Sequence, residues 1–295
     1  MIDRTMLCRG VALTTPSYGK WPLHVLRLNE IGLDEQFLQS IRPSFDRTHW
    51  DHYDVLTGTL QFLQQQSGPV AAEAARIQEQ PDADARRAAL DAVIATLPDA
   101  LRDEVSTFRP HRRRAMRRYA LERSSAGEWA IDALPDTTFK QAVSDYRAKP
   151  RTFALMEDAV TSHPGLLSLL ASAAETIRTV HPDVRRIDAY AHQVTVMARP
   201  RQSGHPAPEG LHQDGADFII SALVVERANV RGGVSRIYEG RGGTTPLIEI
   251  ELQRGEGIFQ MDAGSNLWHE VSAVAVDDPA RDGHRMTLGL DLHVA

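Results

Sequence analysis

Two side chains that can bind a metal ion lie two positions apart in this chain. His212 and Asp214 flank Gln213 within the stretch Glu209–Gly215. In an extended segment successive side chains alternate, so His212 and Asp214 would share one face and Gln213 would take the other. Far downstream, His269 offers a second imidazole. Two imidazoles and one carboxylate form a ligand set that covers one face of an octahedral iron(II) and leaves three coordination positions open.

Such a ligand set indicates oxidation chemistry. The open positions on iron suit a bidentate co-substrate and dioxygen. Neutral nitrogen donors and a carboxylate also keep iron redox-active, without the soft thiolates that favour zinc or an iron–sulfur cluster. The sequence therefore predicts a catalytic iron site with room for a co-substrate.

The segment 285–292 carries an independent signal. Alternation along it places Arg285, Thr287, Gly289 and Asp291 on one face and apolar residues on the other. A strand that aims an arginine inward needs an anionic partner there, because an unpaired buried guanidinium is costly. The planar fork of Arg285 matches a carboxylate bidentately, and Thr287 can add a hydrogen bond. The distal carboxylate of 2-oxoglutarate would satisfy both residues.

The composition is ordinary for a folded globular protein. The 295 residues, enough for one large domain or two small ones, are 42% hydrophobic and 24% charged, with a formal net charge of -6. That charge argues against a general affinity for nucleic acid or anionic membrane. The most apolar run, 218–225, is too short to span a bilayer, and residues 1–18 lack the apolar core of a signal peptide. Because Cys8 is the single cysteine, no intrachain disulfide can form, and we expect a cytoplasmic protein.

Helical patterns dominate the first part of the chain and recur once before the metal motif. Helices are predicted over 34–42, 90–97, 101–105 and 165–180. Asp34 is the expected N-cap of the first helix, and Pro43 is expected to end it. Ser162 is the expected cap of the last, with Pro164 in its first turn.

From residue 186 onward the signals change to short strands and tight turns. Strands are predicted over 187–198, 218–225, 247–252, 257–261, 271–276 and 285–292. Glycine pairs at 232–233 and 242–243 indicate turns between them. This pattern predicts a sandwich or jelly roll, with the helical first half packed on one face, and therefore an α+β fold.

The motifs together resemble a known family. The order His212-x-Asp214, then His269, then Arg285-x-Thr287 is similar to that of the iron(II)- and 2-oxoglutarate-dependent dioxygenases with a double-stranded β-helix (cupin-like jelly-roll) core. More narrowly, the chain resembles the bacterial free L-amino-acid hydroxylases typified by L-isoleucine dioxygenase, a branch that includes enzymes acting on citrulline and pipecolic acid. That narrower likeness rests on Pro208–Phe218, Asn229-x-x-Gly232-Gly233 and His269-Glu270-Val271-Ser272. It implies a mainly helical N-terminal region over 1–107 and a dioxygenase core over 108–295.

The resemblance assigns roles to the motif residues. His212, Asp214 and His269 would bind iron, while Arg285 and Thr287 would hold 2-oxoglutarate. The implied reaction hydroxylates an unactivated C–H bond of a free L-amino acid, consuming dioxygen and 2-oxoglutarate and releasing succinate and CO2. Because Asp214 stands where a halogenase would free a coordination position, we expect hydroxylation rather than halogenation. Gln193, on the strand before the metal motif, is a further candidate for contact with co-substrate or substrate.

A free amino acid needs a cation for its carboxylate and an acid for its ammonium. The candidates for the first role are Arg117, Arg118 and Arg199, and those for the second are Glu209 and Asp217. We expect a small-molecule partner and no nucleic acid, and leave a homodimer open.

Several alternatives stay open at this point. His49-x-Asp51 repeats the metal spacing but lacks a strand pattern, so we expect a loop or helix surface. His284 could replace His269, although its neighbour Arg285 would point it to the opposite face. The run Arg109–Arg118 contains six arginines, which are expected on a solvated helix face or as anchors for carboxylates. The same chemistry on a peptidyl or carrier-bound residue, or a non-enzymatic metal-binding or nucleic-acid-binding module, are the competing functions.

Overall fold

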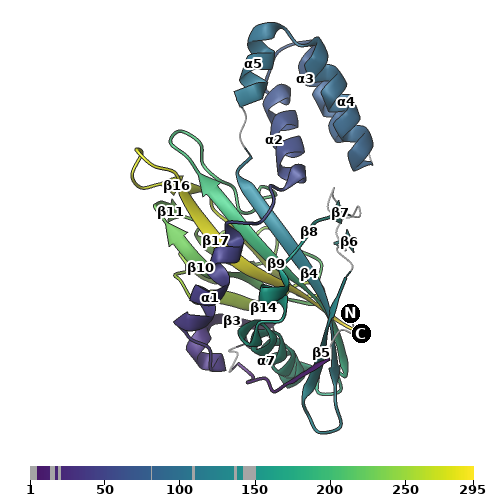
Figure 1. Ribbon diagram of the computed structural model, residues 1–295, viewed down its shortest axis with the longest axis vertical. Coiled ribbons are helices and arrows are strands. Elements are labelled where there is room, and N and C mark those ends of the chain that lie inside the picture. Colours follow the sequence, from purple (N-terminus) through teal and green to yellow (C-terminus); the bar gives the residue numbers. More distant parts are fainter. Residues whose placement is uncertain are drawn as a thin grey trace.

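The protein combines helices with sheets that are almost wholly antiparallel (Figure 1). The structure, a computed structural model, describes residues 5–13, 17–18, 21–80, 82–107, 110–135, 138–141 and 151–295. Within them, the largest sheet has ten strands, which run across it in the order β1 (Met6–Cys8), β5 (Trp129–Leu134), β4 (Arg112–Arg123), β9 (Arg186–Ala198), β17 (Gly283–Val294), β10 (Phe218–Ala228), β14 (Glu256–Met261), β3 (Trp21–Arg27) and β2 (Ser17–Tyr18), with β8 (Ala154–Leu155) parallel to β4.

Smaller sheets complete the β structure. They are the three-stranded β13 (Ile248–Ile250), β12 (Ser235–Glu239) and β15 (Leu267–Val271), the pair β11 (Val230–Gly232) and β16 (Val274–Val276), and the pair β6 (Thr138–Phe139) and β7 (Arg151–Thr152). The helices are the 3-10 helix η1 (Leu28–Ile31), α1 (Glu35–Phe45), α2 (His52–Gln64), α3 (Pro69–Gln78), α4 (Ala83–Thr96), α5 (Asp99–Thr107), α6 (Asp158–Thr161) and α7 (Pro164–Val180).

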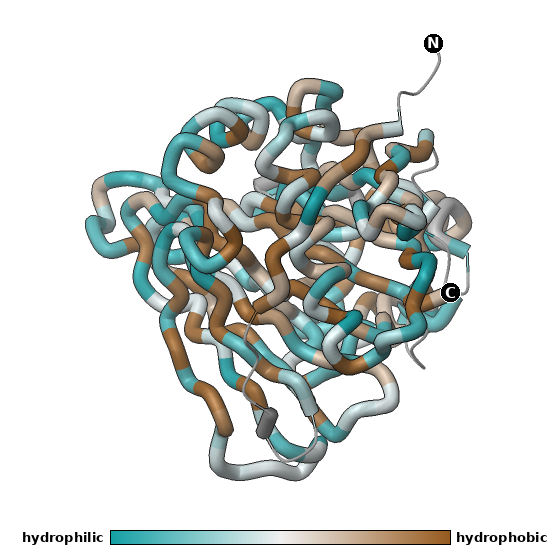
Figure 2. The backbone as a smooth tube through the Cα atoms, turned by 90° about the horizontal axis from the view of Figure 1, so that it is seen from below, coloured by the Kyte–Doolittle hydropathy of each residue, from teal (hydrophilic) through white to brown (hydrophobic). Residues whose placement is uncertain are grey.

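The central strand β17 has one hydrophobic face and one polar face. Its Leu288, Leu290 and Leu292 are buried in the main hydrophobic core, together with residues of α1 and α7. The alternate residues, Arg285 and Thr287 among them, face a cavity on the other side. Figure 2 shows hydrophobic and hydrophilic segments alternating along the strands. The predicted period-2 pattern of 285–292 is therefore confirmed.

Helices α2 to α5 gather at one end of the molecule, beyond the end of strand β4 (Figure 1). They share a small hydrophobic core of their own, which includes Leu56, Leu60, Ile77 and Leu90. The predicted stripe at 90–97 lies on α4 and contributes to that core. The strands β1 and β3, by contrast, join the large sheet, so the division expected at residue 107 is crossed by the sheet and stays a prediction.

Two predicted helix boundaries are wrong. Pro43 does not end α1, which continues to Phe45, because a proline near the end of a helix removes only one backbone bond while the burial of Ser44 and Phe45 stabilises the last turn. The N-cap of α7 is His163 rather than Ser162, since the imidazole Nδ1 of His163 accepts a hydrogen bond from the amide of Gly165. Asp34 caps α1 as predicted, accepting from the amide of Gln36.

Two strand predictions also change. The segment 271–276 is divided between β15 and β16, which pair in different sheets. The arginine run lies on β4, not on a helix, because neighbouring strands on both sides supply ladder partners for its backbone. All five arginines of the run that the structure describes are partly buried, so they do not form a solvated basic face. No described helix is long and apolar enough to cross a membrane.

The second His-x-Asp motif lies in a loop, as expected, with His49 exposed, but its Asp51 is buried and has a structural role. Asp51 is only 3% exposed, and its carboxylate caps α2 by accepting from the amide of Tyr53. The same carboxylate accepts a hydrogen bond from Nε of Arg112 at 2.9 Å. Burial opposes ionisation of Asp51, but the charges of Arg112 and Arg114 lower its pKa overall. Asp51 therefore connects the helical end of the molecule to β4.

We predict that Asp51→Ala destabilises the protein by about 3 kcal/mol, because it leaves a partly buried guanidinium without its carboxylate and removes a helix cap. His49→Ala, which removes the other half of the same motif, should cost less than about 1 kcal/mol. Urea unfolding followed by circular dichroism measures both. Equal effects of the two substitutions would contradict the structural role of Asp51.

Candidate active site

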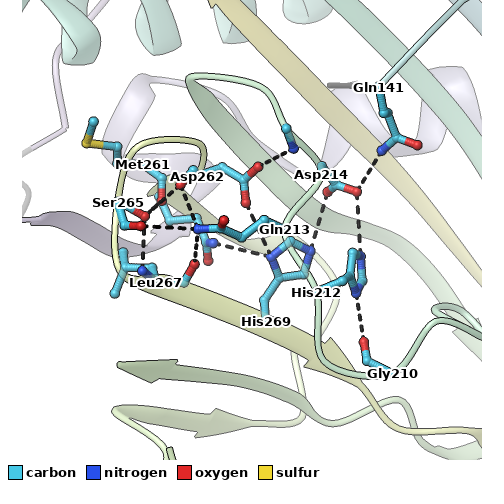
Figure 3. A network of polar contacts seen from close by, with 12 residues as sticks. Gln141, Gly210, His212, Gln213, Asp214, Met261, Asp262, Ser265, Leu267 and His269 are labelled. Atoms are coloured by element: carbon cyan, nitrogen blue, oxygen red, sulfur yellow. Dashed lines mark hydrogen bonds and ion pairs between the residues drawn. The ribbon is translucent and has the colours of Figure 1, made fainter. Parts of the chain in front are cut away.

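His212, Asp214 and His269 converge at one point, with one ligand atom from each within 4.8 Å of the others (Figure 3). Nε2 of His212 lies 3.5 Å from Oδ1 of Asp214, and Nε2 of His269 lies 3.4 Å from Oδ2. Among the described residues this is the one group of three or more potential ligands that could hold a metal ion. The other spacing match, at His49 and Asp51, is not part of such a group.

The backbone brings the two histidines together from different parts of the chain. His212 lies in the segment before β10, whereas His269 lies on β15 of the three-stranded sheet. Their main chains exchange two hydrogen bonds, N–H to O in both directions, each 2.9 Å long. The imidazole rings consequently stand 4.3 Å apart, centroid to centroid.

Gln213, the residue between the two ligands of the motif, points away from them as alternation predicts. Its Nε2 lies within hydrogen-bonding distance of the backbone oxygens of Asp262, Ser265 and Leu267, at 3.0, 3.3 and 2.8 Å (Figure 3). These oxygens belong to the loop that leads into β15. One side chain thus connects the first metal motif to the strand that carries the third ligand.

The residues around the ligands orient them for a metal. Nδ1 of His212 donates to the carbonyl of Gly210 at 2.7 Å, which directs Nε2 toward the other ligands. Gln141 donates to Oδ1 of Asp214 at 2.9 Å. Oδ1 of the fully buried Asp262 lies 3.7 Å from Nδ1 of His269.

The three candidate ligands shift one another's pKa values. Burial opposes the charge of Asp214, but hydrogen bonds from His212 and His269 hold the pKa of this carboxyl well below its ordinary value. Burial alone would lower the pKa of His212, yet its hydrogen bond and ion pair with Asp214 raise it to about 9. A divalent cation between them would replace the proton that the imidazole carries.

Arg285 presents a buried guanidinium toward the same cavity. It is 2% exposed, and its Nε and Nη2 have no hydrogen-bond partner among the described residues. Burial, followed by repulsion from Arg227, lowers its pKa to about 10. The backbone of Gly233, with φ +67°, leaves room for it, since a Cβ there would lie 3.3 Å from Nε of Arg285. An anionic ligand is what this guanidinium lacks.

The cavity that joins these parts has a volume of about 170 Å³. Its lining includes the three potential metal ligands together with Arg285, Thr287, Glu209, Arg112, Arg114, Gln141, Arg151, His192 and Asp291. The sequence-based candidates for iron, for 2-oxoglutarate and, with Glu209, for an ammonium group therefore meet in one place.

Other candidates lie outside it. Gln193 points to the opposite side of β9 and donates to the hydroxyl of Ser44, because the alternation of this strand turns His192 to the cavity instead. His284 faces away from the metal ligands, as expected, and contacts Glu226 at 2.7 Å.

The remaining substrate candidates have structural partners. Asp217 accepts from the amide of Val294, Arg118 lies 3.6 Å from Asp188, and Arg199 donates to the carbonyl of Pro110. Arg117 lines a different cavity, beside Tyr119 and Leu167. None of the four belongs to the lining of the cavity with the metal ligands.

Sequence reasoning missed several residues of the lining. Arg114 and His192 lie on inward-facing positions of β4 and β9. A strand pattern for the arginine run would have indicated Arg114, whereas His192 lies on a strand that was predicted without its direction. The alternation of residues 285–292 predicts the inward position of Asp291 but not its function. Gln141 lies outside the helices and strands, and Arg151 lies on the two-residue strand β7, so no periodicity indicates the direction of either side chain.

Comparison with known proteins identifies the class. Residues 97–291 match the family model described as 2OG-Fe dioxygenase, and the chain belongs to that family. It is therefore a 2-oxoglutarate-dependent iron dioxygenase. A search of curated proteins finds no match.

Solved structures share the fold at low sequence identity. A bsmA homolog from Methylobium petroleophilum PM1 has a TM-score of 0.55 and 20% identity, covering 78% of this chain and 95% of that one. IDO from Bacillus thuringiensis has a TM-score of 0.51 and 13% identity, covering 88% and 99%. The Fe(II)/(alpha)ketoglutarate-dependent dioxygenase TqaL has a TM-score of 0.54 and 12% identity, covering 92% and 82%. At these identities the likeness concerns the fold alone.

The residues present fit the cofactors of the family. Two imidazoles and a carboxylate suit iron(II), and the buried guanidinium of Arg285 without a hydrogen-bond partner at Nε and Nη2 suits a carboxylate of 2-oxoglutarate. Iron held by these three residues, together with 2-oxoglutarate, would supply oxidation of a substrate by dioxygen. The protein's own contribution is to orient these groups.

Gln141→Ala should weaken metal binding roughly 10- to 100-fold, because the amide then no longer orients Asp214. Calorimetric titration with Mn(II) measures this without turnover. Gln253→Ala, which removes an exposed glutamine side chain, should leave the affinity unchanged. Unchanged affinity in the Gln141 variant would show that Asp214 needs no such support.

Gly233→Ala should raise the dissociation constant of 2-oxoglutarate roughly 10-fold or more, since the new methyl group displaces the guanidinium of Arg285. The matched control is Gly32→Ala, which places an alanine at a similar positive φ of +70° but where the added methyl group meets nothing within 4 Å. Titration of the Mn(II)-loaded protein with 2-oxoglutarate measures both variants. Equal affinities would place the co-substrate elsewhere.

Proposed function

We propose that this dioxygenase hydroxylates an unactivated C–H bond of a free L-amino acid, with release of succinate and CO2. The observation that carries the proposal is the mixed charge of the cavity lining. Glu209 and Asp291 offer acids, while Arg112, Arg114 and Arg151 offer cations, all in a cavity of about 170 Å³ that also holds the metal ligands. A small zwitterion matches such a lining better than an uncharged substrate does.

We further propose that the large sheet and the smaller sheets form a double-stranded β-helix. The support is that residues from both contribute to one cavity, and that the backbone pairing of His212 with His269 connects them. On this basis, most strands of the core lie within the residues that the family model matches, and β1, β2 and β3 join the large sheet from outside them.

In the proposed mechanism each residue holds a defined group. His212, Asp214 and His269 bind iron, and Arg285 with Thr287 binds the distal carboxylate of 2-oxoglutarate. Glu209 accepts hydrogen bonds from the substrate ammonium. Because Asp214 is retained as a ligand, hydroxylation is favoured over halogenation.

Apolar residues complete the walls of the cavity. Val194, Val196 and Ile219 line it and exclude water from the groups that react. Exclusion of water strengthens the charged contacts of both co-substrate and substrate, because the local dielectric constant falls.

The test is formation of succinate from 2-oxoglutarate by the iron-loaded protein, with a panel of the standard L-amino acids together with L-citrulline and L-pipecolate. We expect at least one member to stimulate succinate formation and to gain one oxygen atom. His212→Ala should abolish this turnover, whereas His284→Ala, on the opposite face of the sheet, should retain it. Mass spectrometry of the product confirms hydroxylation.

Stimulation by a peptide or thioester of the same residue, without stimulation by any free amino acid, would instead favour the peptidyl or carrier-bound alternative. The nucleic-acid alternative loses its motivation, because the arginines of the run 109–118 that the structure describes are all partly buried.

A further inference from the structure

Two groups of cations face each other across the cavity floor, separated by one strand. The ladder pairing of β17, β9 and β4 aligns cavity-facing residues in rows. One row holds Arg285, Val196 and Arg112, and the next holds Thr287, Val194 and Arg114. Adjacent strands are about 4.8 Å apart, so the backbones of the two groups are roughly 10 Å apart. The two groups therefore come from separate strands, and the partners of each arginine decide which of them lacks an anion.

Arg112 and Arg114 differ in their partners. Arg112 has the buried carboxylate of Asp51 at 2.9 Å. Arg114 has no carboxylate within ion-pair distance among the described residues; its Nη2 lies 3.0 Å from Nδ1 of His192 and its Nε has no hydrogen-bond partner. Of these two arginines of β4, Arg114 is the one whose charge lacks a direct counterion.

A second guanidinium increases this positive charge. Arg151, 5% exposed, also lines the cavity, and its guanidinium donates to the side chain of Gln141. The guanidinium carbons of Arg114 and Arg151 lie 4.2 and 5.7 Å from the ring centroid of Phe153. Burial and then the charge of Arg151 lower the pKa of Arg114 to about 10. Two like charges held together in this way favour an anion beside them.

The neighbouring acids do not contact Arg114, although the charges of Asp51 and Asp291 reach it from a distance. Asp51 is bound by Arg112, and Asp291 lies with its Oδ2 3.4 Å from Nε2 of His192. The phenylalanine ring beneath Arg114 supplies a cation–π contact, which is weaker than a carboxylate in the same position. The arrangement therefore has room for one more anion, on the β4 side of the cavity.

We propose that Arg114, with Arg151 beside it, binds the carboxylate of the substrate. This inference rests on the proposed function, since it identifies how a free amino acid would be recognised. It assigns the two anionic ligands of the reaction to separate arginines: the co-substrate to Arg285 on β17, and the substrate to Arg114 on β4. Glu209 then remains for the ammonium group.

The first experiment compares the best amino acid of the panel with its primary amide, which keeps the ammonium and the side chain but lacks the carboxylate. Arg114→Gln should lower kcat/KM for the amino acid roughly 100-fold, and that for the amide by less than about 3-fold. Arg114→Lys should recover part of the loss, because it restores the charge without the planar fork. Equal losses for acid and amide, or no loss for either, would overturn the proposal.

Arg113→Gln is the matched control. It removes the same charge from the same strand at the next position, where the side chain donates to the carbonyl of Asp46 and lies over Trp50, and where it does not line the cavity. It should alter neither kcat/KM. The dissociation constant of 2-oxoglutarate in the Arg114→Gln variant should stay within about 3-fold of that of the native protein, because Arg285 is untouched.

The second experiment needs no turnover and separates this proposal from the proposed function. The protein is loaded with Mn(II) and N-oxalylglycine, an unreactive analogue of 2-oxoglutarate. It is then titrated calorimetrically with the panel amino acids and with 4-methylpentanoate, which is leucine without its amino group and therefore probes the carboxylate alone. Binding to the native protein that is lost in Arg114→Gln but kept in Arg113→Gln supports the carboxylate site, even if no amino acid is hydroxylated and the proposed function fails. Hydroxylation with unchanged kinetics in Arg114→Gln would leave the function standing and refute the site. Absence of any binding to the loaded native protein also counts against the site.

Discussion

The site depends on the pair of backbone hydrogen bonds between His212 and His269. These bonds join the segment before β10 to β15, which belongs to another sheet. They set the distance between two candidate metal ligands that are far apart in the sequence. Gln213 adds a side-chain connection between the same two regions. A metal ion bound by these residues would add a further connection between the two regions. The affinity for the metal would consequently depend on the relative position of these two regions, and metal binding would stabilise that position.

Charge is the second constraint on the cavity. Buried guanidinium groups are costly, yet the floor of the cavity presents them from β4 and from β17. Asp51 compensates Arg112, while Arg285 and Arg114 have no carboxylate of the protein in contact among the described residues. The ligands would supply the missing negative charge. Because co-substrate and substrate are then held by different arginines, the two can be distinguished even when both carry a carboxylate.

Alternation explains both the successes and the failures of prediction from the sequence. The segment 285–292 has leucines on every second position, so its inward face could be predicted without knowledge of its neighbours, and the structure places that face toward the cavity. β9 has buried residues on both faces, which hides its direction, and Gln193 was assigned to the wrong side of the strand as a result. The prediction of a helix for the arginine run is wrong for a related reason. Arginines occur on helices and strands alike, and only pairing with β5 and β9 establishes a strand. Gln141 could not have been predicted, since its contact with Asp214 joins residues 73 positions apart without any pattern.

The helical end of the molecule gains a role from the same contacts. The carboxylate of Asp54, on the first turn of α2, accepts hydrogen bonds from the amides of His111 and Arg112 at 2.9 and 3.0 Å. Asp51, the cap of that helix, binds the side chain of Arg112. The start of α2 therefore holds both the backbone and a side chain where β4 begins, two residues before Arg114. The helical end of the molecule contributes none of the candidate metal ligands. It nevertheless orients β4, the strand from which the substrate carboxylate would be bound, and in this way it would support the function of the cavity.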